Sequence, residues 1–288
     1  MNSSHSSHSS EHTEPGRSAK KRPSEISLPG TRRFALHSAE GRQYEILLSL
    51  PENDPPPQGY PVIYLLDGHA LFATVFEAER AQSRRAEKTG VASSVIVGIG
   101  YPSGLPFSPE RHFDYTLPVP VENLPASRDG QPWPEHGGAD LFLEFIETVL
   151  KPRIESELPI DRGRQTLMGH SFGGLFTLHT LFTRPGAFRT YIAGSPSLHW
   201  AHPQIGLEEE AFGAALQARS RTLNLLIALG ELEDDSRFRM VNNGRMLAER
   251  LEKLRDCGLN VQFRLFEGEN HGSTLPSLVS PALRMAVL

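Results

Sequence analysis

The chain has 288 residues, of which 38% are apolar and 22% are charged, and its formal net charge at pH 7 is −5. A protein that binds nucleic acids or anionic membrane surfaces usually carries excess positive charge, and this composition shows no such excess. No run approaches the ~20 apolar residues of a membrane span, and a single cysteine, Cys257, allows no internal disulfide.

The N-terminal segment, residues 1–29, consists mostly of Ser, His, Glu, Lys and Pro and holds few side chains that a core could bury. Such a composition predicts a disordered tail. The tail also lacks the roughly 7–15-residue apolar core of an export signal, which favours a soluble, cytoplasmic protein. The remaining residues, 30–288, have the length and apolar content of a single α/β domain.

Apolar runs alternate with helical patterns along that domain. A hairpin is expected from residues 31–37 and 43–50, and buried strands from residues 62–66, 94–98, 165–168, 190–193, 223–229 and 261–266. Helices are expected at residues 70–87, 139–155, 174–182, 207–218 and 240–254, with a short final helix at the C-terminus. Buried strands that alternate with helices predict a mostly parallel sheet covered on both faces, with an antiparallel pair at its N-terminal edge.

Residues 100–138 are rich in Pro and Gly and show no clear periodicity. A loop of this length inside a compact domain is usually functional or mobile. We therefore expect this segment to lie over the active site.

Residues 169–173, Gly-His-Ser-Phe-Gly, stand where an expected strand runs into an expected helix. In such a turn Gly169 and Gly173 relieve crowding of the backbone and leave the serine hydroxyl at the tip. Ser171 is therefore a candidate nucleophile, and the N–H of Phe172 at the helix N-terminus can face a developing oxyanion. The alternative is a glycine-rich turn with a structural role only.

Asp67, Gly68 and His69 follow directly on the strand expected at residues 62–66. A second oxyanion N–H comes from this position in enzymes with such a serine turn. Gly68 allows the backbone to approach a substrate closely, and the N–H of Gly68 or His69 would pair with that of Phe172. The alternative is a tight strand-to-helix turn capped by Asp67, and both interpretations can hold together.

The serine also needs an acid and then a histidine downstream of it. Among the histidines after the elbow helix, His271 alone also follows a further expected strand, and it lies in a loop before the last helix. Glu233, three residues beyond the strand-end Gly230, is the preferred acid, and Glu231 is its competitor. The alternative for His271 is a solvated loop histidine.

Several runs in fixed order carry a family resemblance: Leu65-Leu66-Asp67-Gly68, Gly100-Tyr101-Pro102, residues 111–116, Gly137-Gly138-Ala139, residues 169–176, Ser195-Pro196-Ser197 with Trp200, residues 230–233 and Asn270-His271-Gly272-Ser273. From about residue 30 to the C-terminus the chain resembles the esterase D-like α/β-hydrolases. Within them it is most similar to the siderophore trilactone esterases, which hydrolyse enterobactin-type and bacillibactin-type macrolactones.

The resemblance implies an α/β-hydrolase fold, Ser171 as nucleophile and His271 as base, and it indicates Arg111 as a contact for an anionic substrate. The alternative for Arg111 is a pair with Asp114 that braces the loop. The resemblance leaves the acid open, because some of these esterases resemble a Ser–His dyad. Exported members begin with a signal peptide, whereas this chain shows none, so its substrate is expected inside the cell.

The expected reaction is hydrolysis of a carboxylic ester through an acyl-enzyme. The expected partner is a small-molecule ester, and the resemblance indicates a ferric catecholate siderophore. No metal or organic cofactor is needed for this chemistry, although iron can arrive with the substrate. A general carboxylesterase or acyl-thioester hydrolase is the alternative enzyme, and a siderophore-binding module with a structural turn is the alternative without catalysis. The oligomeric state does not follow from the sequence.

Overall fold

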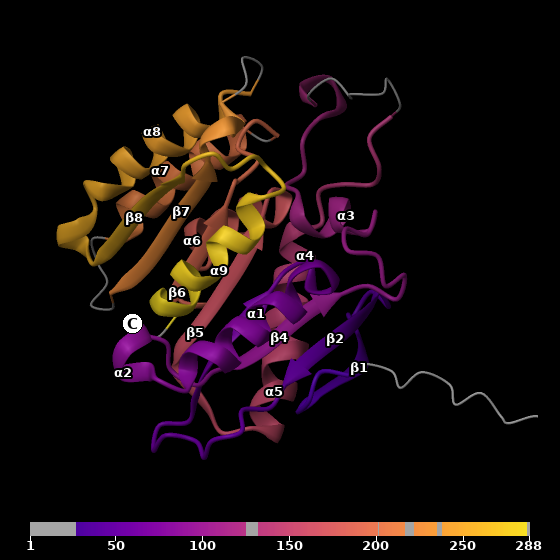
Figure 1. The fold of residues 1–288 in the computed structure, drawn as a ribbon. Coiled ribbons are helices and arrows are strands. Elements are labelled where there is room, and N and C mark those ends of the chain that lie inside the picture. Colours follow the sequence, from indigo (N-terminus) through magenta and orange to yellow (C-terminus); the bar gives the residue numbers. More distant parts are fainter. Residues whose placement is uncertain (1–26, 125–131, 201, 217–221, 235–237, 287–288) are drawn as a thin grey trace, which may run out of the picture.

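The computed structural model describes residues 27–124, 132–200, 202–216, 222–234 and 238–286. The tail expected at residues 1–29 lies almost wholly outside these residues, so its disorder and the single-domain boundary stay predictions. The described residues form one mixed sheet with helices on both faces (Figure 1).

The sheet has eight strands in the order β1-β2-β4-β3-β5-β6-β7-β8. They are β1 (Thr31–His37), β2 (Gln43–Ser49), β3 (Tyr60–Leu65), β4 (Val95–Gly100), β5 (Ile160–His170), β6 (Thr190–Gly194), β7 (Leu223–Gly230) and β8 (Leu259–Phe266). Strand β2 runs antiparallel to both β1 and β4, and all other neighbours are parallel. The predicted parallel sheet with an antiparallel N-terminal edge is confirmed.

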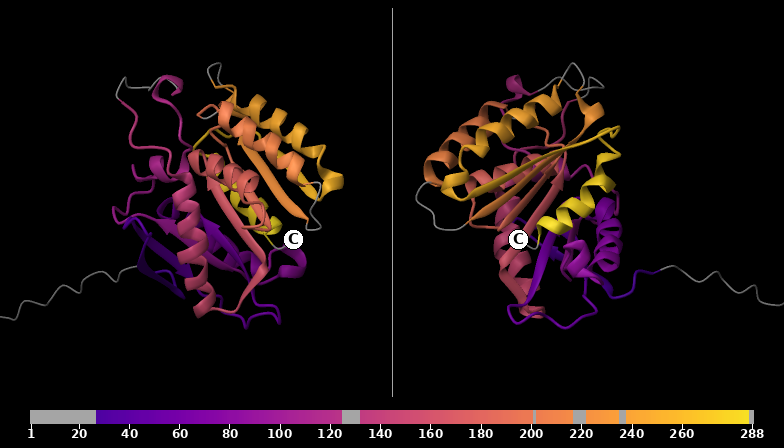
Figure 2. Two further views of the ribbon diagram at one scale, coloured as in Figure 1. Left: turned by 180° about the vertical axis from the view of Figure 1, so that it is seen from behind. Right: turned by 60° about the vertical axis from the view of Figure 1, so that its left-hand side comes forward.

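The helices of the described residues are α1 (Gly68–Ser83), α2 (Ala86–Thr89), α3 (Arg111–Tyr115), α4 (Ala139–Phe145), α5 (Lys151–Glu157), α6 (Phe172–Thr183), α7 (His202–Leu216), α8 (Met240–Glu252) and α9 (Thr274–Met285). Helices α1 and α9 pack side by side on one face of the sheet, and α6, α7 and α8 cover the other (Figures 1 and 2). Successive side chains of a strand point to opposite faces, so a central strand contributes to both layers. Tyr64 of β3 packs in the α6 layer, and Leu65 packs in the α1 layer.

The helix expected at residues 139–155 is interrupted in the structure. Between α4 and α5 the chain forms a π-helical turn, η2 (Ile146–Leu150). Pro152 stands in the first turn of α5, where it has no N–H to donate to the preceding turn. A wider turn before a proline accommodates the missing hydrogen bond. The helical pattern of the sequence did not predict this π-helical turn.

His179 of α6 joins three helices in the layer behind the site. Its Nδ1 lies 2.9 Å from Glu208 Oε2 on α7, and its Nε2 lies 3.3 Å from Asp140 Oδ1 on α4. Burial opposes the charged imidazole, but the two carboxylates outweigh it and raise the pKa of His179 to about 9. In the unfolded chain the pKa of His179 is about 6.5. The ion pairs of the protonated imidazole with Asp140 and Glu208 therefore stabilise the fold fully below that pH, and this stabilisation is lost as the pH rises through about 9.

We expect His179→Gln to lower the free energy of unfolding by on the order of 2 kcal/mol at pH 6. The difference from the parent should shrink as the pH rises from 6.5 to 10. Urea unfolding at several pH values measures it, with His37→Gln on the exposed face of β1 as a control without such partners. A difference that does not change with pH would show that His179 contributes through packing alone.

Candidate active site

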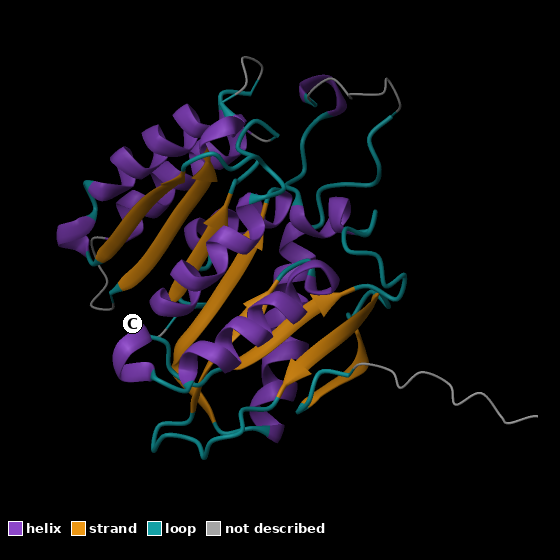
Figure 3. Ribbon diagram, in the orientation of Figure 1, coloured by secondary structure: helices purple, strands orange, loops and turns teal. Residues whose placement is uncertain are grey.

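The residues singled out in the sequence gather at the carboxyl ends of parallel strands. Loops after β3, β5, β7 and β8 carry, in that order, Asp67, Ser171, Glu233 and His271. Since parallel strands end at one edge of the sheet, four segments far apart in the sequence meet there (Figure 3).

Ser171 forms the sharp turn between β5 and α6. Its backbone has φ 61° and ψ −117°, outside the regions that most L-residues adopt. A Cβ on Gly169 would lie 2.2 Å from Gly173 O, so the predicted need for glycine holds there. It does not hold at Gly173, whose added Cβ would make only ordinary contacts; the second crowded position is Gly174, where a Cβ would lie 2.6 Å from Gly194 O.

The Ser171 side chain is half-exposed at the tip of this turn. Its Oγ lies 3.2 Å from Ser197 Oγ, and its N–H donates to Gly194 O at 2.9 Å. The N–H of Phe172 begins α6 and has no acceptor among the residues that the structure describes. An unused donor at a helix N-terminus beside the hydroxyl is the arrangement that an oxyanion requires.

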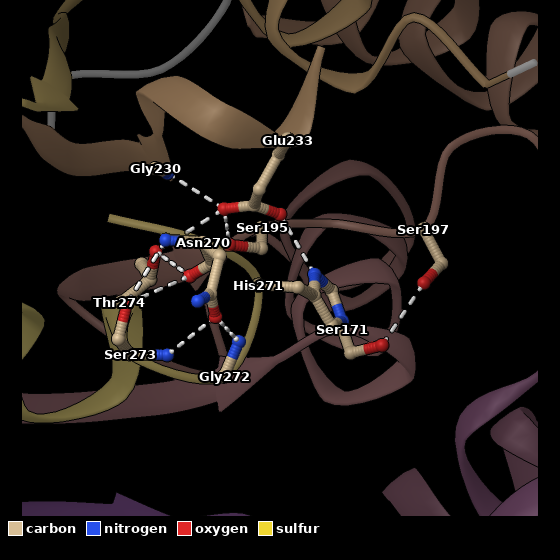
Figure 4. Close-up of polar contacts among 10 residues, drawn as sticks. All are labelled: Ser171, Ser195, Ser197, Gly230, Glu233, Asn270, His271, Gly272, Ser273 and Thr274. Carbon is tan, nitrogen blue, oxygen red and sulfur yellow. Dashed lines mark hydrogen bonds and ion pairs between the residues drawn. The ribbon is translucent and has the colours of Figure 1, made fainter. Parts of the chain in front are cut away.

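His271 and Glu233 are joined directly. His271 Nδ1 lies 2.7 Å from Glu233 Oε2, and the imidazole lies between the carboxylate and Ser171 (Figure 4). Glu231, the competing acid, instead accepts a hydrogen bond from the N–H of Gly268 at 2.9 Å. The geometry therefore favours Glu233 as the partner of the histidine.

The other carboxylate oxygen of Glu233 also has hydrogen-bond partners. Its Oε1 accepts from Ser195 Oγ at 2.7 Å and from the N–H of Gly230 at 2.6 Å, and Thr274 Oγ1 lies 3.2 Å from it. Burial raises the pKa of Glu233, but the hydrogen bonds from His271, Ser195 and Gly230 outweigh burial and hold it below its ordinary value. The carboxylate is therefore ionised at neutral pH, and the protonated Nδ1 leaves Nε2 of His271 free to act as a base.

Asn270 shapes the loop that carries His271. Its Oδ1 accepts from the N–H groups of Gly272 and Ser273 at 3.0 and 3.1 Å, and its carbonyl accepts from Thr274 N and Oγ1. These bonds form a tight turn that leads into α9. No role for Asn270 or Ser195 follows from the sequence, because their contacts join segments that are far apart in the chain.

A second histidine, His170, packs against His271 with ring centroids 4.6 Å apart. Burial, with the neighbouring His271 adding to it, lowers the pKa of His170 to about 3. His170 therefore remains neutral at physiological pH and places no positive charge against the base.

Gly68 and His69 form the first turn of α1, and their N–H groups have no acceptor among the described residues. A Cβ on Gly68 would lie 2.8 Å from the backbone of Gly98 in β4, so this turn requires glycine. The Nε2 of His69 lies 3.1 Å from Tyr101 O, which follows β4, and 3.3 Å from Glu45 Oε2 on β2. Oxyanion roles for Gly68, His69 and Phe172 stay predictions.

Arg111 lies in α3, a short helix inside the long loop that was expected to lie over the site. The pair with Asp114 considered for it is wrong: the guanidinium binds Asp67, and Asp114 accepts from Tyr101 Oη at 2.9 Å. Only 8% of Arg111 is exposed. Its contact with an anionic substrate stays a prediction.

Aromatic side chains gather beside Ser171. The ring of Phe172 lies 5.1 Å from Trp200 and 4.9 Å from His112, and Trp133 lies 4.6 Å from Trp200. Trp133 and His112 come from the long loop, whereas Trp200 follows β6. The residue after the nucleophile is thus packed into an aromatic cluster that joins the long loop to the segment after β6.

The family model described as "Putative esterase" matches residues 38–274 of this chain. The chain belongs to this esterase family. It is an ester hydrolase with the α/β-hydrolase fold, so the interpretation as a binding module without turnover is set aside.

Relatives of this esterase include the ferri-bacillibactin esterase BesA of Bacillus subtilis (strain 168), which is 51% identical over 263 residues that cover 91% of each chain. The siderophore enterobactin esterase of Emericella nidulans is 36% identical over 85% of this chain and 88% of its own. The solved structure of the BES protein from Bacillus cereus superposes with a TM-score of 0.86 at 42% identity, covering 92% of this chain and 98% of that one.

Within the described part of the esterase, no group of three or more His, Cys, Asp or Glu side chains is arranged to hold a metal ion. None of its described helices is long and apolar enough to cross a membrane.

Proposed function

We propose that the protein hydrolyses the ester bonds of a catecholate siderophore trilactone through an acyl-enzyme on Ser171. The observation that carries the chemistry is the 2.7 Å contact of Glu233 with His271 beside the elbow serine. The substrate class is supported by the relatives, whose names describe siderophore esterases acting on bacillibactin and enterobactin.

In the first half of the reaction, the Ser171 hydroxyl turns from Ser197 towards Nε2 of His271, which takes its proton as Oγ attacks the ester carbonyl. Glu233 stabilises the imidazolium that forms. The N–H groups of Phe172 and of Gly68 or His69 donate hydrogen bonds to the carbonyl oxygen and stabilise the negative charge that develops on it. The C–O bond to the alcohol then breaks, and His271 returns the proton to the leaving alkoxide.

In the second half, His271 takes a proton from water, and the resulting hydroxide attacks the acyl carbon on Ser171. The tetrahedral intermediate collapses, the acid is released, and the serine recovers its proton from His271. Each ester of the macrocycle passes through the same steps. Iron enters only as part of the substrate.

The aromatic cluster around Phe172, which is itself only partly buried, favours a substrate with flat aromatic rings. Phe172 follows the nucleophile directly and packs against Trp200 at 5.1 Å, so a catecholate amide beside the reacting ester meets apolar, polarisable surfaces. Cytoplasmic hydrolysis, expected from the sequence, is part of this proposal.

The test is a substrate panel with purified protein: a p-nitrophenyl ester, an acyl thioester, and ferric and iron-free triscatecholate trilactones, with products resolved by mass. We expect the trilactones to be opened to linear esters with kcat/KM at least about 10-fold above that for the p-nitrophenyl ester, because the larger substrate offers more binding energy to the transition state.

Hydrolysis of the p-nitrophenyl ester or the thioester without cleavage of either trilactone would contradict the siderophore assignment. That result would favour a general carboxylesterase or an acyl-thioester hydrolase. Ser171→Ala, carried through the same panel, excludes turnover by a contaminating esterase.

A further inference from the structure

Two residues with left-handed or strained backbones lie next to each other at the site. Asp67 has φ 51° and Ser171 has φ 61°. They follow β3 and β5, neighbouring strands in which Leu65 pairs with Met168. A non-glycine residue in such a conformation costs on the order of 1–3 kcal/mol and persists only where its surroundings hold it in place.

Arg111 holds both turns with one side chain. Its Nε donates to Asp67 Oδ1 at 2.7 Å, and its Nη2 donates to Asp67 Oδ2 at 2.8 Å. The same Nη2 lies 3.4 Å from the carbonyl oxygen of His170, the residue before the nucleophile. From the same short helix, Tyr115 Oη accepts the N–H of Asp67 at 3.1 Å.

We propose that Arg111 and Asp67 are positioning residues that set the distance between the two halves of the oxyanion hole. Asp67 immediately precedes Gly68 and His69, and His170 is separated from Phe172 only by Ser171. A planar guanidinium in a bidentate pair fixes direction as well as distance. The inference rests on the proposed hydrolysis and its oxyanion donors.

The surroundings of Arg111 favour this role over direct substrate contact. The side chain of Asp67 is 1% exposed and that of Arg111 is 9% exposed. The rings of Tyr115, Phe107 and Phe172 enclose the guanidinium at 5.3, 5.5 and 5.6 Å. An incoming anion would compete with a buried carboxylate that already binds the guanidinium in a fork.

The test must remove the pair without leaving one buried charge behind, which would destabilise the fold. Asp67→Asn combined with Arg111→Met removes both charges at nearly constant volume. We expect the double variant to keep its far-UV spectrum and to lower kcat for a neutral p-nitrophenyl ester by about 10- to 100-fold, because each oxyanion donor contributes about that much or more. KM should change by less than about threefold.

A transition-state analogue distinguishes an effect on the position of the oxyanion donors from a nonspecific destabilisation of the fold. A trifluoromethyl ketone forms a hemiketal with the serine and places an oxyanion in the hole, so its Ki should rise by the same factor as kcat/KM falls. Tyr115→Phe, which removes the hydrogen bond that Tyr115 Oη accepts from the N–H of Asp67 and leaves the charge pair intact, should show the same pattern to a smaller extent. It serves as the test if the double variant does not fold.

The matched control is Arg250 with Glu209, a bidentate pair between α8 and α7 with both contacts at 2.7 Å. Arg250→Met with Glu209→Gln removes a bidentate arginine–carboxylate pair of the same kind that does not contact the serine turn, and it should leave kcat and Ki unchanged.

A native kcat in folded Asp67→Asn/Arg111→Met protein would overturn the inference. So would a loss confined to KM for the charged trilactone, which would show that Arg111 contacts the substrate. If the proposed function is wrong, the parent protein itself will cleave no trilactone. The kcat values of parent and variant for the p-nitrophenyl ester would still test the role of Arg111 and Asp67.

Discussion

Ser171→Ala is expected to lower kcat by about 10³-fold or more on every substrate that the protein hydrolyses, because it removes the atom that attacks the ester. Ser171 is only partly buried, so the loss of its hydroxyl should leave the melting temperature nearly unchanged. Steady-state kinetics with a p-nitrophenyl ester measures the effect. Ser156→Ala, at an exposed serine on α5, is the matched control and should behave as the parent.

His271→Ala should cost about as much as Ser171→Ala, since the two side chains act as one unit. For the same reason the double variant should be little worse than either single one. Losses that multiply in the double variant would mean that the two residues act independently, and near-native turnover by folded Ser171→Ala protein would remove the nucleophile from the mechanism.

Glu233→Gln is the second change with a large expected effect. The substitution keeps the volume but replaces the Oε2 acceptor, 2.7 Å from His271 Nδ1, by an amide that can present an N–H to the ring. The imidazole would then be held in the wrong tautomer, with its base nitrogen protonated, and we expect kcat to fall by about 10²- to 10⁴-fold.

The control for Glu233 is Glu231→Gln. Glu231 contacts Gly268 rather than the histidine, so its substitution should change kcat by less than about threefold. The reverse ranking would transfer the role of the acid to Glu231. Small effects at both positions and in their double variant would support a Ser–His dyad.

The sheet and the serine turn could be predicted from local patterns in the sequence. Continuous apolar runs marked the buried strands, and the strand and helix that flank residues 169–173 gave the serine motif its context. The choice between Glu231 and Glu233 depended on the path of the chain after β7, where a short turn, η3 (Glu231–Glu233), directs alternate carboxylates in different directions. Spacing along the chain favoured Glu233, but only the contacts distinguish the two.

The partner of Arg111 illustrates what local patterns miss. Asp114 lies three residues away, the spacing of a helical ion pair, whereas Asp67 is separated from Arg111 by 44 positions. The contact forms because α3 folds back over the ends of β3 and β5. The left-handed conformation of Asp67 likewise has no signal in the sequence, because aspartate occurs in many turn types.

The most direct test of the central claim is the mass of the protein during turnover. Rapid acid quenching of the parent with a p-nitrophenyl ester, followed by intact-mass and peptide analysis, should show one added acyl group on the peptide that contains Ser171, together with a burst of p-nitrophenol. The adduct should be absent from Ser171→Ala. Hydrolysis without an adduct, or an adduct on another residue, would contradict an acyl-enzyme at Ser171.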